Sequence, residues 1–195
     1  MSKKPRAWQR MLSGRRLDLL DPSPVDIEID DIAHGLARVA RWNGQTTGDW
    51  AFSVAQHSVI VEQVMADLQP DLEIHWRLAG LLHDAPEYVV GDLISPFKAA
   101  MGVDFKTLEN RLQEAIHIRF GIPPLVPTKI HRLIKKADKA SAYFEATQVA
   151  GFQPDEAGKF WGIPKTSLQI DATPWPTATA KEVFLERFEE LSTAL

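Results

Sequence analysis

The residues best suited to chemistry are a neighbouring histidine and aspartate, His83 and Asp84. The residues just before them are mostly apolar, so we expect a helix that enters the core and ends near this pair. Removing an imidazole and a carboxylate from water costs free energy unless a partner satisfies both groups. A divalent transition-metal ion would satisfy them, because His nitrogen and Asp oxygen form a common mixed ligand set. The pair therefore predicts a metal site that needs further ligands.

Two more candidate ligands lie on other predicted helices. His57 is on the apolar side of a helix predicted from Ser53 to about Leu68, and Asp138 is on the inward arc of a long predicted helix. Each residue alone has an ordinary structural explanation, as a hydrogen-bonded core histidine or an aspartate paired with a lysine. Separate helices that each direct such a residue toward the core favour a shared site with coordination positions left for water and substrate. The predicted ligands are His57, His83, Asp84 and Asp138.

The elements that must position these residues are all predicted to be helical. Apolar residues recur at helical spacing, and no segment alternates as a strand does. We expect the first helix to begin at Asp30 or Asp31 and to end at Asn43-Gly44. The other predicted helices cover about 53–68, 73–85, 105–120, 127–149 and 177–195. The prediction is one all-α domain over 1–195, with an irregular arm over 1–28, a core over about 29–150, and an irregular Pro/Gly-rich excursion over 151–177 before the closing helix.

Composition limits the class of protein. At 195 residues and 45% hydrophobic, the chain is expected to form one soluble domain with a sizeable core. The absence of cysteine excludes disulfides, thiolate catalysis and finger-type zinc sites, and it suits the cytoplasmic location that we expect. No apolar run is long enough to span a bilayer, so we expect no membrane partner. The segment before Asp18 contains several basic residues and no acidic one. It could contact nucleic acid, although a solvated terminus is the simpler interpretation.

The four candidate ligands in an all-helical chain resemble the ligand pattern of the HD-domain metal-dependent phosphohydrolases. The similarity extends to flanking motifs. His83 to Glu87, followed by Gly91-Asp92-Leu93 and Pro96-Phe97-Lys98, resembles the signature of the bacterial 5′-deoxynucleotidase (YfbR-like) family. Arg41-Trp42 corresponds to an Arg-Trp pair of that family. The resemblance covers roughly residues 12–150, while the loop before His57 and the 151–177 excursion depart from the family's pattern.

The resemblance implies an HD-domain helical bundle that removes the 5′-phosphate from (deoxy)nucleoside monophosphates. One divalent ion (Co, Mn, Zn, Fe or Cu) on the four ligands would activate a water molecule for attack. Glu87 would orient this water or accept its proton, and Asp92 would contact a sugar hydroxyl or assist the leaving oxygen. Arg41 suits a phosphate because a guanidinium donates paired hydrogen bonds, and Trp42 could pack on the sugar or base. The resemblance also implies a homodimer, for which Phe184 and Phe188 could serve the interface or the core.

Other interpretations remain open. One is an HD phosphohydrolase that acts on nucleoside triphosphates or a cyclic nucleotide, although the short loop after the His-Asp pair favours a monophosphate. Another is a non-catalytic nucleotide-sensing HD domain, against which the retained ligands, Glu87 and Arg41 argue. His34 could line the pocket or be structural, and Lys98 could bind phosphate or be solvated. The remaining histidines are interpreted as structural or exposed: His75, His117 and His131.

Overall fold

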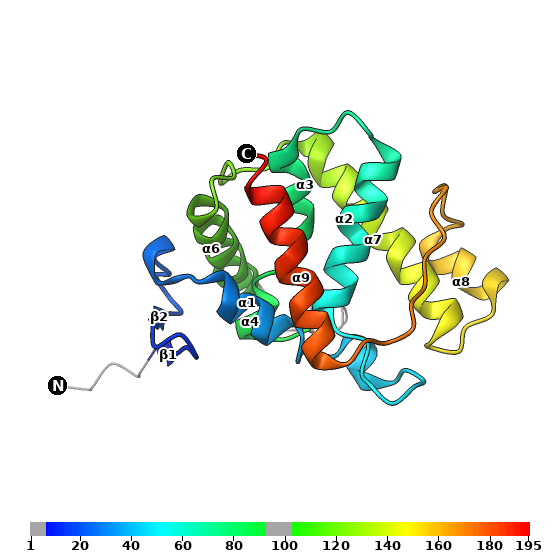
Figure 1. The fold of residues 1–195 in the computed structure, drawn as a ribbon, viewed down its shortest axis with the longest axis horizontal. Coiled ribbons are helices and arrows are strands. Elements are labelled where there is room, and N and C mark those ends of the chain that lie inside the picture. Colours follow the sequence, from blue (N-terminus) through cyan, green and yellow to red (C-terminus); the bar gives the residue numbers. More distant parts are fainter. Residues whose placement is uncertain (1–6, 93–102) are drawn as a thin grey trace.

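The structure is a computed structural model that describes residues 7–92 and 103–195. Helices make up most of this part of the chain, which confirms the predicted all-α fold (Figure 1). No helix within the described ranges is long and apolar enough to cross a membrane. The helices are α1 (Ile29–Leu36), α2 (Val54–Leu68), α3 (Ile74–Leu81), α4 (Glu87–Val90), α6 (Val103–Arg119), α7 (Thr128–Gln148), α8 (Pro154–Trp161) and α9 (Thr177–Ser192), with short 3-10 turns η1 (Pro24–Asp26) and η2 (Arg41–Gly44).

Helix α2 is the central element of the bundle. Most of its residues are buried, and it packs against α3, α7 and α9. Figure 1 shows α9 lying beside it. The Ser53 hydroxyl accepts a hydrogen bond from the Gln56 backbone N–H at 3.2 Å, which satisfies an amide that has no partner inside the helix. The predicted helix that Ser53 opens and Leu68 closes is therefore confirmed.

Two apolar clusters form the core around α2. One joins α1, α3, α6 and α9 and contains Phe184, which is fully buried within the single chain, with Phe188 packed against it. The other joins α2 and α7. Helix α3 approaches α2 so closely that a Cβ at Gly80 would lie 2.3 Å from the Met65 sulfur. A side chain at residue 80 would therefore require the Met65 side chain to move.

The His-Asp pair lies in a turn rather than in a helix. Helix α3 was expected to continue to Ala85 but ends at Leu81, and residues 82–86 form a series of turns before α4 begins at Glu87. Pro86 has no backbone N–H to continue an α-helical ladder, so the chain changes direction here. The Glu87 N–H instead donates to the Asp84 carbonyl at 3.0 Å. His83 and Asp84 are thus presented on a tight turn between α3 and α4.

The first helix is shorter than predicted. It ends at Leu36, and the expected end at Asn43-Gly44 is wrong. The cause is backbone pairing with a distant segment. The Arg41 N–H donates to Phe52 O at 2.9 Å, and residues 40 and 53 form an antiparallel bridge. Extended pairing of this kind holds the chain out of the helical conformation, and Trp42 then adopts a positive φ of 57° inside η2.

Two segments that were predicted to be irregular contain regular structure. In the 1–28 arm, β1 (Trp8–Arg10) and β2 (Arg16–Asp18) pair as an antiparallel hairpin. Two of its basic residues have internal partners: Arg15 bonds Glu28 at 2.6 Å, and the Arg16 guanidinium lies 4.4 Å from the centre of the Trp8 ring. In the 151–177 excursion, α8 occupies eight residues, and the remainder is irregular as predicted. Figure 1 places α8 at the opposite end of the molecule from the hairpin.

A buried carboxylate joins three helices of the bundle. Glu62 of α2 is fully buried. It accepts hydrogen bonds from Arg77 Nε at 2.7 Å and Arg187 Nε at 2.6 Å, and these arginines belong to α3 and α9. Ionised groups that are removed from water are stable only when they are paired in this way.

We expect Glu62→Ala to lower the free energy of unfolding by about 2–3 kcal/mol, because it removes the acceptor of the part-buried Arg77 and leaves Arg187 with only its bond to Glu190. Urea denaturation followed by circular dichroism measures this. Glu186→Ala, at an exposed position on α9, is the matched control and should change stability by no more than about 0.5 kcal/mol. Equal stability of the two variants would contradict a structural role for Glu62.

Candidate metal centre

The four predicted ligands come together between α2, α7 and the turn after α3. One ligand atom from each of His57, His83 and Asp138 can be chosen so that all three lie within 4.8 Å of one another. His57 Nε2 lies 3.3 Å from Asp138 Oδ1. Asp84 Oδ2 completes the group, at 3.2 Å from His83 Nε2 and 3.6 Å from His57 Nε2. These residues could therefore hold one metal ion.

In each histidine, a hydrogen bond at Nδ1 orients the ring so that Nε2 faces the other candidate ligands. His57 Nδ1 lies 2.6 Å from Glu145 Oε1, and His83 Nδ1 lies 2.8 Å from the Gly80 carbonyl oxygen. An Nδ1–H that donates to these acceptors leaves the Nε2 lone pair directed into the centre, the arrangement typical of metal-binding histidines. Both Nε2 atoms are buried, and neither makes a hydrogen bond within the described part of the chain. Buried polar atoms rarely remain without a partner, and a bound cation would satisfy both, so the donor set fits a divalent metal.

The charges around the centre support this fit. Burial and Arg41 lower the pKa of His57, but Glu145 and Asp138 outweigh them and raise it to about 9. Burial alone would raise the pKa of Asp84, yet His83, His57 and Arg41 hold it far below its usual range. Without a metal, His57 therefore carries a proton at neutral pH beside ionised carboxylates. The centre favours a positive charge at this position, which a metal ion can supply in place of the proton.

Glu145 of α7 is an important residue of the site that the sequence analysis did not single out. This fully buried carboxylate accepts four hydrogen bonds. Oε1 accepts from His57 Nδ1 at 2.6 Å and from Ser141 Oγ at 2.8 Å. Oε2 accepts from Arg41 Nε at 2.9 Å and from Trp42 Nε1 at 2.8 Å. Glu145 thus binds one metal ligand and both members of the Arg-Trp pair.

A sequence signal for Glu145 existed. It lies seven residues after Asp138, two turns along the same face of a helix, and its neighbours Phe144 and Ala146 are apolar. An acid in that position faces the same region as the metal ligand. The signal does not by itself distinguish a buried acid from one at the edge of the face.

Arg41 and Trp42 were expected to contact substrate, and the structure shows what else they contact. Besides its bond to Glu145, the Arg41 guanidinium places Nη1 3.9 Å from Asp84 Oδ2, and its side chain is 14% exposed. The Trp42 ring packs against Phe152 and Trp161, with ring centres 5.9 and 5.5 Å apart. Trp42 is therefore part of a packed aromatic cluster. The substrate contacts of both residues stay predictions.

The two candidate acids follow the His-Asp turn. Glu87 begins α4 and is 3% exposed. Asp92 is half-buried after Gly91, whose φ of +75° turns the chain. Burial lowers the pKa of Arg41, but the carboxylates of Glu145, Asp84, Asp138 and Asp92 raise it above its ordinary value. Asp92 thus lies near enough to act on Arg41, while the catalytic roles of Glu87 and Asp92 stay predictions. The motif Pro96-Phe97-Lys98 lies outside the described residues.

The other histidines divide between surface and core. His34 lines two surface hollows between α1, α9 and the hairpin, and neither hollow includes a predicted metal ligand. This placement favours its structural interpretation. His75 packs on Trp76, with ring centres 4.3 Å apart. His117 is 3% exposed and His131 is exposed, as the sequence suggested.

Comparison with known proteins gives two relatives. The chain is 62% identical to an uncharacterized protein of Rhodobacter capsulatus over 163 residues, which is 84% of this chain and 83% of that protein. It is 31% identical to the uncharacterized protein YfdR of Escherichia coli K12 over 171 residues, which is 86% of this chain and 85% of YfdR. The chain belongs to the family of these two proteins. No family model matches the chain. Neither of these names states an activity.

We expect Glu145→Ala to weaken metal binding about 10- to 100-fold, because it removes the acceptor that orients His57. Competition with a chromophoric chelator measures the affinity, and the visible spectrum of the Co²⁺ form reports the ligand geometry. Glu182→Ala, exposed on α9, is the control and should change neither. Unchanged affinity and an unchanged Co²⁺ spectrum in Glu145→Ala would remove this residue from the metal centre.

Proposed function

We propose that the protein is a metal-dependent phosphohydrolase that removes the 5′-phosphate from (deoxy)nucleoside monophosphates. The observation that carries the proposal is the pair of buried Nε2 atoms, on His57 and His83, that converge with Asp84 and Asp138 and make no hydrogen bond of their own among the described residues. A ligand set of this type, with the motifs around it, resembles that of the HD-domain phosphohydrolases. The four side chains suit a centre that leaves coordination positions for water and substrate.

A cavity of about 320 Å³ opens onto the centre and supports a small-molecule substrate. His83 and Asp138 form part of its wall, so a ligand in this cavity would lie against the metal site. Lys135 places an ammonium group on the same wall, which suits a phosphate. The remaining lining residues come from α3, α6, α7 and the segment before α7: Ala79, Gln113, His117, Val126, His131 and Ile134.

In this reaction, a water oxygen bonds to phosphorus as the bond from phosphorus to the 5′ oxygen breaks, giving inorganic phosphate and a nucleoside. A divalent ion at the centre would supply a water of lowered pKa and would offset the negative charge of the phosphate oxygens. Glu87 would accept the proton of the attacking water. Arg41, held in place by Glu145, adds positive charge beside the centre, and Asp92 would assist the leaving oxygen. The homodimer that the resemblance implies also stays a prediction.

The direct test is release of inorganic phosphate from 5′-dAMP and 5′-AMP by metal-stripped protein, with Mn²⁺, Co²⁺ or Zn²⁺ added back. We expect release only with metal, and faster from the deoxynucleotide. A parallel panel of nucleoside di- and triphosphates and cyclic nucleotides distinguishes the other HD phosphohydrolase activities. No release from any of these substrates by folded, metal-loaded protein would overturn the proposal and favour a nucleotide sensor.

Variants of the site should separate metal binding from turnover. We expect Asp138→Ala to lose bound metal and activity together, because it removes a ligand. Glu87→Gln should keep the metal and lower kcat by at least about 100-fold, because it removes the proton acceptor. Metal analysis and kcat measured on the same preparations test both. A Glu87→Gln enzyme with wild-type kcat would exclude this residue as the base, and full metal content in Asp138→Ala would exclude that ligand.

A further inference from the structure

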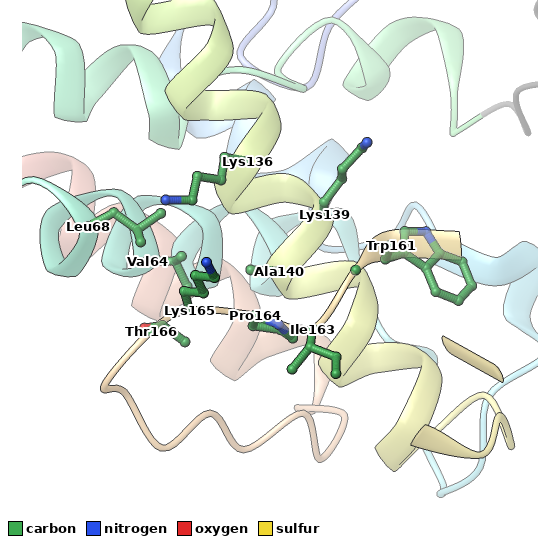
Figure 2. Close-up of a pocket in the computed structure, with 11 residues that line it drawn as sticks. Val64, Leu68, Lys136, Lys139, Ala140, Trp161, Ile163, Pro164, Lys165 and Thr166 are labelled. Atoms are coloured by element: carbon green, nitrogen blue, oxygen red, sulfur yellow. The ribbon is translucent and has the colours of Figure 1, made fainter. Parts of the chain in front are cut away.

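A second cavity, of about 300 Å³, lies beside α7 and has no predicted metal ligand in its wall (Figure 2). It is lined by the C-terminal half of α2, by α7 and by the segment that follows α8. Asp138 faces the metal centre, while Lys136 and Ala140, two positions to either side, line this second cavity. The complete lining is Val64, Leu68, Lys136, Lys139, Ala140, Trp161, Gly162, Ile163, Pro164, Lys165 and Thr166.

The charge of this cavity is positive. It has three lysines, Lys136, Lys139 and Lys165, and no carboxylate side chain in its lining. Across residues 7–92 and 103–195, none of the three forms an ion pair. Figure 2 shows the Lys136 and Lys165 side chains extending toward Val64 and Leu68, whereas Lys139 points away from them. All three lysines are exposed, and an anion between Lys136 and Lys165 would offset their like charges.

The other end of the cavity is aromatic. Trp161 lies at the opposite end of the lining from Lys136 and Lys165 in Figure 2, and its indole ring extends further away from them. The indole is held by the aromatic cluster, since its ring centre lies 5.3 Å from that of Phe152. A flat ring bound at this end would contact a side chain that is already fixed.

The outer wall of the cavity is fixed by Asp67 of α2. Its carboxylate accepts a hydrogen bond from Thr166 Oγ1 at 2.6 Å and another from the Ser167 N–H at 2.9 Å, and the Ser167 hydroxyl also donates to it. These bonds tie the segment next to Lys165 to the central helix. They also use the acceptor capacity of Asp67, so this acid is already engaged at the rim. The backbone that carries Lys165 is thus held in place against α2.

We propose that this second cavity binds a nucleotide, with its phosphates between Lys136 and Lys165 and its base toward Trp161. Positive charge at one end and an aromatic surface at the other match a ligand with an anionic group and a flat ring, and the volume suits a small ligand. The site is separate from the metal centre and does not depend on the proposed phosphohydrolase activity.

Isothermal titration of metal-stripped protein with ATP, in the presence of EDTA, tests the proposal. We expect binding that weakens about tenfold in Lys136→Gln and in Lys165→Gln, and further in the double variant. Adenosine lacks the phosphates and inorganic phosphate lacks the base, so each should bind more weakly than ATP. Because charge attraction contributes, the affinity should also fall as salt concentration rises.

The matched control is Lys135→Gln, since Lys135 neighbours Lys136 in sequence but lines the cavity at the metal centre. Binding in the second cavity predicts that ATP affinity is kept in Lys135→Gln and in Asp138→Ala. Loss of ATP binding in those two variants would place the nucleotide at the metal centre and overturn the proposal. So would the absence of ATP binding to wild-type protein, or wild-type affinity in the folded double variant. This titration measures binding and not phosphate release, so a negative result would leave the proposed hydrolysis untouched.

Discussion

A single buried carboxylate, Glu145, orients one ligand of the candidate metal centre and holds the arginine beside it. Three of its four hydrogen bonds connect α7 to His57 on α2 and to Arg41 and Trp42 on η2, and the fourth, from Ser141, lies within α7. A fully buried acid is tolerated only when it is well paired, so the partners of Glu145 are constrained as strongly as Glu145 itself. The orientation of a metal ligand and the position of a nearby guanidinium therefore depend on the same group. The orientation of a candidate ligand and the placement of positive charge are in this way linked through one side chain.

Buried acids also explain how helices of mixed composition form one bundle. Glu62 and Glu145 are both fully buried, and each is neutralised by arginine from a distant part of the chain. Glu62 joins α2 to α3 and α9 through two arginines, whereas Glu145 bonds His57 at the candidate metal centre. The same physical arrangement is thus used once for stability and once to position a site.

Much of the fold could be predicted from the sequence because helical periodicity is a local property. The bounds of α2 and α7 follow from apolar spacing and from the capping Ser53. The end of α1 could not be predicted in the same way, because it depends on pairing between residues 40 and 53 in another part of the chain. The hairpin and α8 are short, and short elements carry little periodic signal. The four metal-ligand candidates were recognisable by residue type, whereas Glu145 and the two cavities depend on which side chains are brought together in space.

The close contact between Gly80 and Met65 links the core to the orientation of a candidate ligand. Because there is no side chain at residue 80, α3 lies against the Met65 sulfur, and the carbonyl of the same glycine receives the His83 Nδ1–H. A side chain at residue 80 would have to displace the Met65 sulfur, next to the carbonyl that His83 contacts. The direction of the His83 lone pair is therefore set partly by van der Waals contact between apolar groups. Substitutions at this contact between two core positions are therefore expected to alter the orientation of a candidate metal ligand.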